Sequence, residues 1–316
     1  TGGRWGCTMH RVRVQSACVA VWVEGGSACT DLWECEFRGA RFGALLTHKA
    51  AVSMCKSSCN QARMSGVLVE EGARASLRDC DILGCGRVGV DVQGVESPDL
   101  ENGEAGGDWQ SHANVVGCSI VDTMDIAVCV TDSASATVQN SRILRSGEAG
   151  VQVGGMGTRA RLVNNLLKGG TGVGVVAHSG ALCTLQGNRI FQHSKVGVEA
   201  AGWASYVTMT DNEICEGGAQ GVRVRNAARL VATNNKVLMN AEEGVEVCSA
   251  GHAELRENRI AHNAACIHAH RFPGVVINKD NSTSCRYDGC WKCNPQFRQT
   301  RSDTLPVGDE IEIRMQ

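Results

Sequence analysis

Apolar residues recur along this chain with a period of 22 to 24 residues. One series is the apolar residue that follows a recurrent Asn-x pair, and its members are Leu166, Ile190, Ile214, Val237 and Ile260. Steps of the same size, with one exception of 38 residues, extend the series back through Ile143, Ile120, Ile82, Cys59, Phe37 and Val14. A second series, the Val of a Gly-Val pair, keeps the same period from Val67 to Val245. Two series with one period predict a repeat protein.

Within each repeat the apolar residues alternate with polar ones, as in Gly221-Val222-Arg223-Val224. Alternation with a period of two predicts short strands with one buried face, separated by Gly, Asn and Ser turns. Leucine-rich repeats share the period, but their Leu spacing and helical half are missing here. We therefore predict an all-β fold, a right-handed parallel β-helix of about eleven coils, with neighbouring coils about 4.8 Å apart.

An asparagine column accompanies the apolar series. Its predicted members are Asn164, Asn188, Asn212, Asn235 and Asn258, and upstream the same slot holds Ser141, Cys118, Cys80, Ser57 and Cys35. Asn tolerates the left-handed conformation of turns, and stacked amides can bond to the amides above and below. We interpret this column as architecture and not as catalytic machinery.

The single 38-residue step contains about 15 extra residues, which fall at 95–110 and read VESPDLENGEAGGDWQ. The segment has no basic residue, and its acidic residues are Glu96, Asp99, Glu101, Glu104 and Asp108. Such a composition is typical of a solvated loop. Because insertions in solenoids often lie on the binding side, the alternative is a partner-binding loop anchored by Trp109.

The register fades after Ile260, and residues 266–269 resemble a last Gly-Val strand. We therefore predict a β-helix over 1–269 and a C-terminal cap over 270–316. The cap contains Cys285, Cys290 and Cys293, whose spacing is compatible with a structural zinc ion. His268, His270 or Cys266 would supply the fourth ligand. The alternative is a thiol-rich cap without metal, and no other cofactor is expected.

Composition limits the functional classes. The net charge of -2 argues against nucleic acid as a partner, and no apolar stretch is long enough for a membrane helix. Most of the 17 Cys fall in repeat slots, where Cys acts as a small buried apolar residue. Reduced, buried thiols favour an intracellular location, cytoplasmic or nuclear.

Carbohydrate enzymes share this fold, so we searched the outward slot of the Gly-Val strands for chemistry. From coil to coil this slot holds Gln152, Val176, Glu199, Arg223, Glu246 and His268. Glu199 and Glu246 lie two coils apart, about 9–10 Å between backbones, near the upper limit for a pair of inverting carboxylates. Arg223 lies between them, which favours a ladder of alternating charges. These three residues are weak catalytic candidates.

The motifs of pectin hydrolases and alginate epimerases do not occur in the chain in the required order. Calcium-dependent lyases need clustered Asp on one strand face, and Asp91 has no such neighbours in the sequence.

Segments such as Gly244-Val245-Glu246-Val247 and Asn258-Arg259-Ile260 resemble the right-handed β-helix repeats of eukaryotic F-box proteins. The resemblance covers most of the chain and implies a substrate-recognition module of a ubiquitin ligase, although the chain contains no F-box. It transfers no functional residue to this sequence.

Our main hypothesis is therefore a non-catalytic β-helix that binds a protein partner, either as such a receptor or as a structural subunit. The alternative is a carbohydrate-binding or carbohydrate-active β-helix, of the lyase, hydrolase or epimerase type, with Glu199, Arg223 and Glu246 at its site.

Overall fold

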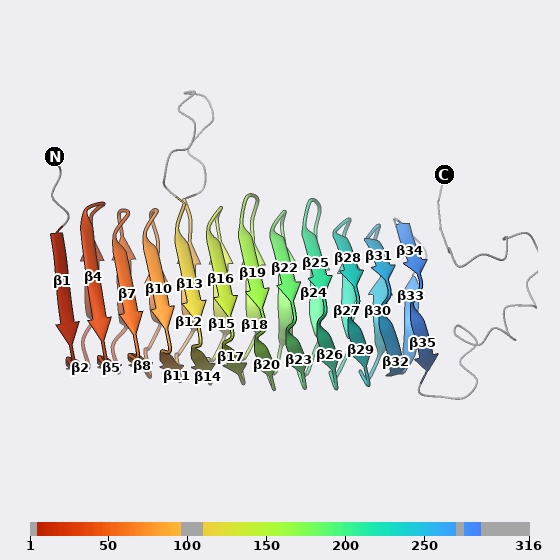
Figure 1. Cartoon of the computed structure of the whole chain (residues 1–316), viewed down its shortest axis with the longest axis horizontal. Helices are drawn as coiled ribbons and strands as arrows, with labels where there is room; N and C mark the ends of the chain where they lie inside the picture. The colour runs from red at the N-terminus through yellow and green to blue at the C-terminus, as the bar shows by residue number, and fades with distance from the viewer. Residues whose placement is uncertain (1–4, 96–109, 270–274, 286–316) are drawn as a thin grey trace, which may run out of the picture.

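The computed structural model describes residues 5–95, 110–269 and 275–285. In these ranges the chain forms 35 strands, which wind into eleven complete three-strand coils and two strands of a twelfth. The strands stack along one axis into three parallel sheets, with the first coil at one end and the last at the other (Figure 1). The predicted parallel β-helix is therefore confirmed, and the described part of the chain contains no helix.

Sheet A contains the first strand of every coil. Its strands are β1 (Trp5–His10), β4 (Ala28–Trp33), β7 (Ala51–Cys55), β10 (Arg74–Arg78), β13 (His112–Val116), β16 (Ser135–Gln139), β19 (Arg159–Val163), β22 (Leu182–Gln186), β25 (Tyr206–Thr210), β28 (Arg229–Thr233), β31 (His252–Arg256) and β34 (Val275–Lys279).

Sheet B contains the second and shortest strand of each coil. Its strands are β2 (Arg13–Gln15), β5 (Glu36–Arg38), β8 (Ser58–Asn60), β11 (Asp81–Leu83), β14 (Ser119–Val121), β17 (Arg142–Leu144), β20 (Leu166–Lys168), β23 (Arg189–Phe191), β26 (Glu213–Cys215), β29 (Lys236–Leu238), β32 (Arg259–Asn263) and β35 (Ser282–Cys285).

Sheet C contains the third strand, which carries the Gly-Val pair. Its strands are β3 (Val19–Glu24), β6 (Phe42–Thr47), β9 (Ser65–Val69), β12 (Val88–Gln93), β15 (Ile126–Thr131), β18 (Ala149–Gly154), β21 (Val173–His178), β24 (Val198–Ala201), β27 (Val222–Arg225), β30 (Glu243–Val247) and β33 (Ala265–Ala269).

The alternating pattern places apolar side chains from all three sheets inside the coil. In a single coil, Val222 and Val224 of sheet C, Leu230 of sheet A and Val237 of sheet B are all at most 3% exposed. They belong to one continuous core that runs through the coils. Since a single coil cannot enclose this core, each coil depends on its neighbours for stability.

The apolar series of sheet B pairs in register from coil to coil, as predicted, except at one position. Ile143 pairs with Leu167, and Leu167 pairs with Ile190, so the inward residue of this coil is Leu167. Leu166 lies on the outer face of β20 and is half-buried. The predicted register was therefore one residue early in this coil.

Side chains at the corner between sheets A and B form an asparagine ladder. Its members are Asn165, Asn188, Asn212, Asn235, Asn258 and Asn281. In each step the Oδ1 atom accepts hydrogen bonds from the backbone N–H and the Nδ2 of the preceding Asn, as between Asn188 and Asn212, where both are 2.9 Å. The Nδ2 atom also donates to a carbonyl of sheet A, for example from Asn212 to Leu185 at 3.0 Å.

Asn164, which we predicted in this column, lies one residue before it. It adopts a left-handed φ of 52°, the conformation also found in Asp211 and Asn234 at the same place in later coils. Asn165 is 2% exposed and makes the ladder hydrogen bonds instead. Of the two adjacent asparagines, the first turns the chain and the second joins the ladder.

Toward the N-terminus the same column contains Cys and Ser. Cys118 donates its N–H to the hydroxyl of Ser141, and the thiol of Cys80 donates to the carbonyl of Met54 at 3.3 Å. The amide of Ser141 in turn donates to Oδ1 of Asn165, which joins the two types of ladder.

Close packing at the corner with sheet B explains the Gly of the repeated Gly-Val pair in sheet C. A methyl group at Gly197 would lie 2.5 Å from Cγ2 of Ile214 and 2.6 Å from the carbonyl oxygen of Gly221. The same two kinds of neighbour crowd Gly174 and Gly89. The repeated Gly therefore lets adjacent coils approach at this corner.

We expect Gly197→Ala to lower the free energy of unfolding by about 1–3 kcal/mol, because the backbone oxygen of Gly221 cannot move away without disturbing the next coil. Gly26→Ala is the matched control, since its methyl group would meet Lys49 at an ordinary 3.6 Å. Urea unfolding of both variants measures the difference. Equal stabilities would contradict the packing explanation.

The β-helix extends past the predicted boundary at residue 269. Strands β34 and β35 pair in parallel with β31 and β32 and so begin a twelfth coil. In the chain, the acidic segment lies between β12 of sheet C and β13 of sheet A. Nowhere in the described ranges does a helix have the length and apolarity to cross a membrane.

Candidate functional site

The outer face of sheet C differs from an ordinary solvated sheet face, because several of its polar side chains are covered. We call this face the outer strip. Its middle row contains one residue per coil, namely Trp22, Leu45, Leu68, Asp91, Cys129, Gln152, Val176, Glu199, Arg223, Glu246 and His268. An edge row toward sheet A contains Gln93, Thr131, Gly154, His178, Ala201 and Arg225.

Glu199 is the most deeply covered carboxylate of the strip, with a side chain only 4% exposed. Arg223 Nη2 lies 2.8 Å from its Oε2 atom, and Arg225 Nε lies 2.6 Å from its Oε1 atom. Each carboxylate oxygen therefore has its own guanidinium partner from the next coil. The arginine side chains remain 29% and 40% exposed, so they present positive charge at the surface.

This arrangement fixes the charge of Glu199. Burial alone would raise its pKa, but hydrogen bonds and charges from Arg223 and Arg225 outweigh burial and hold the pKa below the ordinary value. Glu199 is thus an anion at neutral pH with both oxygens engaged. A general acid must hold a proton at neutral pH, so Glu199 does not suit that role, and both of its oxygens already have arginine partners.

Further toward the C-terminus the strip continues with Glu246 and a second pair. Glu246 pairs in register with Arg223, as the sequence indicated, and Arg223 therefore lies between the two candidate carboxylates. Beside them, Glu243 Oε1 lies 3.1 Å from Nδ1 of His268. Burial would raise the pKa of Glu243, but its backbone hydrogen bond and His268 lower it overall.

A second polar cluster surrounds Asp91, which lies four coils from Glu199 toward the N-terminus. Asp91 is 8% exposed and accepts a 3.0 Å hydrogen bond from Nε2 of Gln93. Burial raises its pKa, and the charge of Asp132 acts in the same direction. Burial also raises the pKa of Glu70, with Glu71 and Asp91 contributing. Asp91 therefore has acidic neighbours that linear sequence did not reveal, because they come from adjacent coils.

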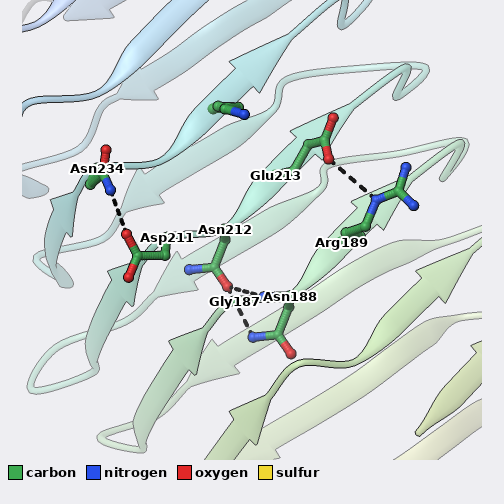
Figure 2. Close-up of a pocket in the computed structure, with 8 residues that line it drawn as sticks. Gly187, Asn188, Arg189, Asp211, Asn212, Glu213 and Asn234 are labelled. Atoms are coloured by element: carbon green, nitrogen blue, oxygen red, sulfur yellow. Dashed lines mark hydrogen bonds and ion pairs between the residues drawn. The ribbon is translucent and has the colours of Figure 1, made fainter. Parts of the chain in front are cut away.

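A surface pocket lies on the other side of the coil, beside the asparagine ladder (Figure 2). Its lining includes Asn188 and Asn212, which bond to each other, and the ion pair of Arg189 with Glu213 at 3.2 Å. Most of the polar side chains that line the pocket form hydrogen bonds or ion pairs with one another. The pocket therefore belongs to the architecture of the corner, and the outer strip remains the better candidate.

Some predicted residues lie outside the described ranges. They are Glu96, Asp99, Glu101, Glu104, Asp108, Trp109, Cys290 and Cys293. Cys285 ends β35, but its side chain is not described. Within the described ranges no three His, Cys, Asp or Glu side chains form a metal-binding group, and the described cysteines are free thiols. The predicted zinc site stays a prediction.

Comparison with known proteins identifies the class that this fold defines. The family model "Right handed beta helix region" matches residues 1–167, 101–214 and 157–298, and the chain belongs to this family. No curated protein matches the sequence at a significant level.

Solved structures add similarity of fold. The A-module of the mannuronan C-5 epimerase AlgE4 from Azotobacter vinelandii is 14% identical over 90% of this chain and 89% of its own, with a TM-score of 0.52. The Agl-KA catalytic domain is 9% identical over 92% of this chain and 60% of its own, with a TM-score of 0.53. The resemblance to F-box proteins gains no support from these comparisons.

Sequence reasoning singled out Glu199, Arg223 and Glu246 but missed Arg225 and the acidic neighbours of Asp91. Arg225 is two residues after Arg223 and so lies on the same face of β27. Reading the edge row as well as the middle row would have found it.

Proposed function

We propose that this chain binds an extended carbohydrate along the outer strip of sheet C, with the Glu199–Arg223–Arg225 cluster as the principal contact. One observation carries the proposal: a buried carboxylate holds two partly exposed guanidinium groups on an outward sheet face. Guanidinium groups fixed in this way offer donors to hydroxyl and carboxylate oxygens without further ordering of their side chains.

The exposed arginine donors favour an acidic sugar over a neutral one. Glu199 with Arg223 and Arg225 carries a net charge of about +1, because Glu199 is ionised and arginine stays protonated, whereas Glu246 adds an acidic group beside Arg223. A uronate carboxylate matches the fork of donors that Arg presents. The fold is also shared with an enzyme named as a mannuronan epimerase, which supports a carbohydrate ligand over the protein partner of our main hypothesis.

The proposal stops at binding. Both carboxylate oxygens of Glu199 are bound by arginines, and Arg223 lies in register between Glu199 and Glu246, so the proposal assigns no acid and base pair to these glutamates. Incubation with uronate and neutral glycans would test this directly. Turnover that disappears in a Glu199→Gln, Glu246→Gln double variant would show that catalysis occurs here after all.

The binding test uses calorimetry with linear uronate and neutral oligosaccharides. A Glu199→Gln, Arg225→Gln double variant removes the buried carboxylate together with one of its two guanidinium partners, and it leaves Arg223, which is 29% exposed, an amide oxygen at position 199 as acceptor. We expect uronate affinity to fall about tenfold or more. The matched control is the Glu213→Gln, Arg189→Gln double variant, which removes the ion pair of the same type on sheet B. Absence of glycan binding by the wild-type chain, or equal loss in both variants, would overturn the proposal.

A further inference from the structure

The turns from sheet C to sheet A occur in two lengths in the part of the chain around the outer strip. Tight turns have two residues, both with positive φ, as in Asp132-Ser133, Ser179-Gly180 and Asn226-Ala227. Among the turns from β15 to β28, two contain one extra residue, Gly155-Met156-Gly157 and Gly202-Trp203-Ala204. The tight turn of Ser179 and Gly180 lies between them, so long and short turns alternate from coil to coil.

The longer turns have their own hydrogen-bonded anchors. After the Met156 turn, the hydroxyl of Thr158 donates to the carbonyl of Gly154 at 2.8 Å and accepts from the N–H of Ser133 at 3.0 Å. Ser205 makes the equivalent pair of bonds after the Trp203 turn, to Ala201 and from Gly180. The tight turns have Ala at this position, namely Ala134, Ala181 and Ala228. The extra residues are therefore held on braced turns.

The two extra residues expose large apolar side chains. Met156 is 60% exposed and Trp203 is 75% exposed. Their turns are two coils apart, about 9–10 Å between backbones. The Met156 sulfur lies over Gly180, at a place where a side chain on Gly180 would collide with it. The shorter turn of Ser179 and Gly180 therefore lies between the two longer ones, with Met156 folded over it and Trp203 on the next turn, and we call this stretch of surface the turn patch.

The turn patch borders the outer strip directly. Gly154 and Ala201 of the edge row immediately precede the two long turns, and both are small residues. Arg225, one coil beyond Ala201, belongs to the Glu199 cluster. A ligand that contacts the arginines and continues along the edge row therefore reaches Trp203 first and Met156 next.

We propose that Trp203 and Met156 form a stacking subsite for a sugar ring of the glycan that the outer strip binds. A pyranose ring has an apolar C–H face and a rim of hydroxyl groups. Trp offers a rigid apolar surface to that face, and Met offers a polarisable one. The hydroxyl of Ser179 and Nδ1 of His178, which lie 3.0 Å apart on the intervening coil, are available to the hydroxyl groups of the rim. The inference rests on the proposed function and assigns it a second contact region.

The test compares Trp203→Ala with Trp33→Ala, a control in which an exposed Trp of sheet A is removed far from the turn patch. Calorimetry with the best-bound uronate oligosaccharide is expected to show about tenfold weaker binding for Trp203→Ala and no change for Trp33→Ala. Trp203→Phe should lie between, because it keeps an aromatic face. Met156→Ala should weaken binding to a smaller extent, and thermal unfolding should be unchanged in all four variants.

The outcomes separate this inference from the function beneath it. Unchanged affinity in Trp203→Ala, together with loss in the Glu199→Gln, Arg225→Gln variant, overturns the subsite and leaves the proposed function standing. A wild-type chain that binds no glycan overturns both. Retained glycan binding in Trp203→Ala, with a protein partner captured by wild type and lost in this variant, would reassign the turn patch to protein docking.

Discussion

Asn212→Ala is expected to lower the free energy of unfolding by about 3 kcal/mol, because several buried groups lose their partners together. The side chain of Asn212 accepts from the N–H and Nδ2 of Asn188 and donates to the carbonyl of Leu185 and to Asn235. Asn212 is 1% exposed, so water cannot replace these bonds without opening the corner. Urea unfolding followed by circular dichroism measures the loss.

Asn234→Gly is the matched control for this prediction. Asn234 lies next to the ladder in a left-handed conformation that Gly adopts freely, and its side chain donates to Asp211 at the surface. We expect the control to change the free energy of unfolding by less than about 1 kcal/mol. A similar loss in both variants would mean that the ladder contributes no more than an exposed turn.

His193 should make the protein sensitive to mild acid. It is 2% exposed, and burial lowers its pKa to about 4, while the carbonyl of Leu167 acts in the opposite direction. Between pH 6.5 and 4 the unfolded chain therefore binds a proton that the folded chain does not. The free energy of unfolding has its full value above pH 6.5 and decreases by about 3 kcal/mol in total as the pH falls through this window.

His193→Asn should remove this part of the pH dependence. Asn240 and Asn263 occupy the same corner in later coils and bond to each other at 2.9 Å, so Asn suits the position. The readout is the difference in unfolding free energy between pH 7 and pH 4.5 for variant and wild type. His262→Asn, at an exposed position of β32, serves as control. A pH dependence that persists in His193→Asn would assign the acid sensitivity to other groups.

The coil architecture could be predicted because its cause is local and repeated. Each strand needs one buried face, and residues such as Ile190, Ile214 and Val237 satisfy that need at constant spacing. The repeated Gly of sheet C was a visible pattern, but its reason is a contact between coils. Only coordinates show that Gly197 faces Ile214 and the backbone of Gly221.

The misplaced register at Asn164 shows where pattern reasoning was ambiguous. The sequence Asn164-Asn165-Leu166-Leu167 permits two alignments that satisfy the apolar and polar pattern equally. The choice depends on which Asn adopts the left-handed turn and which can reach Asn188 in the next coil. Neither condition is encoded in spacing alone.

The outer strip could be located from the sequence, but its chemistry could not. The middle-row order of Glu199, Arg223 and Glu246 was correct, yet the burial of Glu199 and its second partner Arg225 depend on side-chain directions. The single extra residues Met156 and Trp203 were visible as a difference in turn length. Their pattern emerges only when the sheet C turns are aligned by coil.

The change from thiols to amides along the ladder predicts where local unfolding of the molecule begins. From Asn165 onward the corner is joined by amides that donate and accept, whereas Cys35, Cys80 and Cys118 contribute thiols, which are weak donors. In a solenoid, free energy accumulates locally between adjacent coils. Fraying should therefore start in the thiol-containing half and halt at the first amide coil, which leaves the arginine cluster on the more persistent half of the molecule.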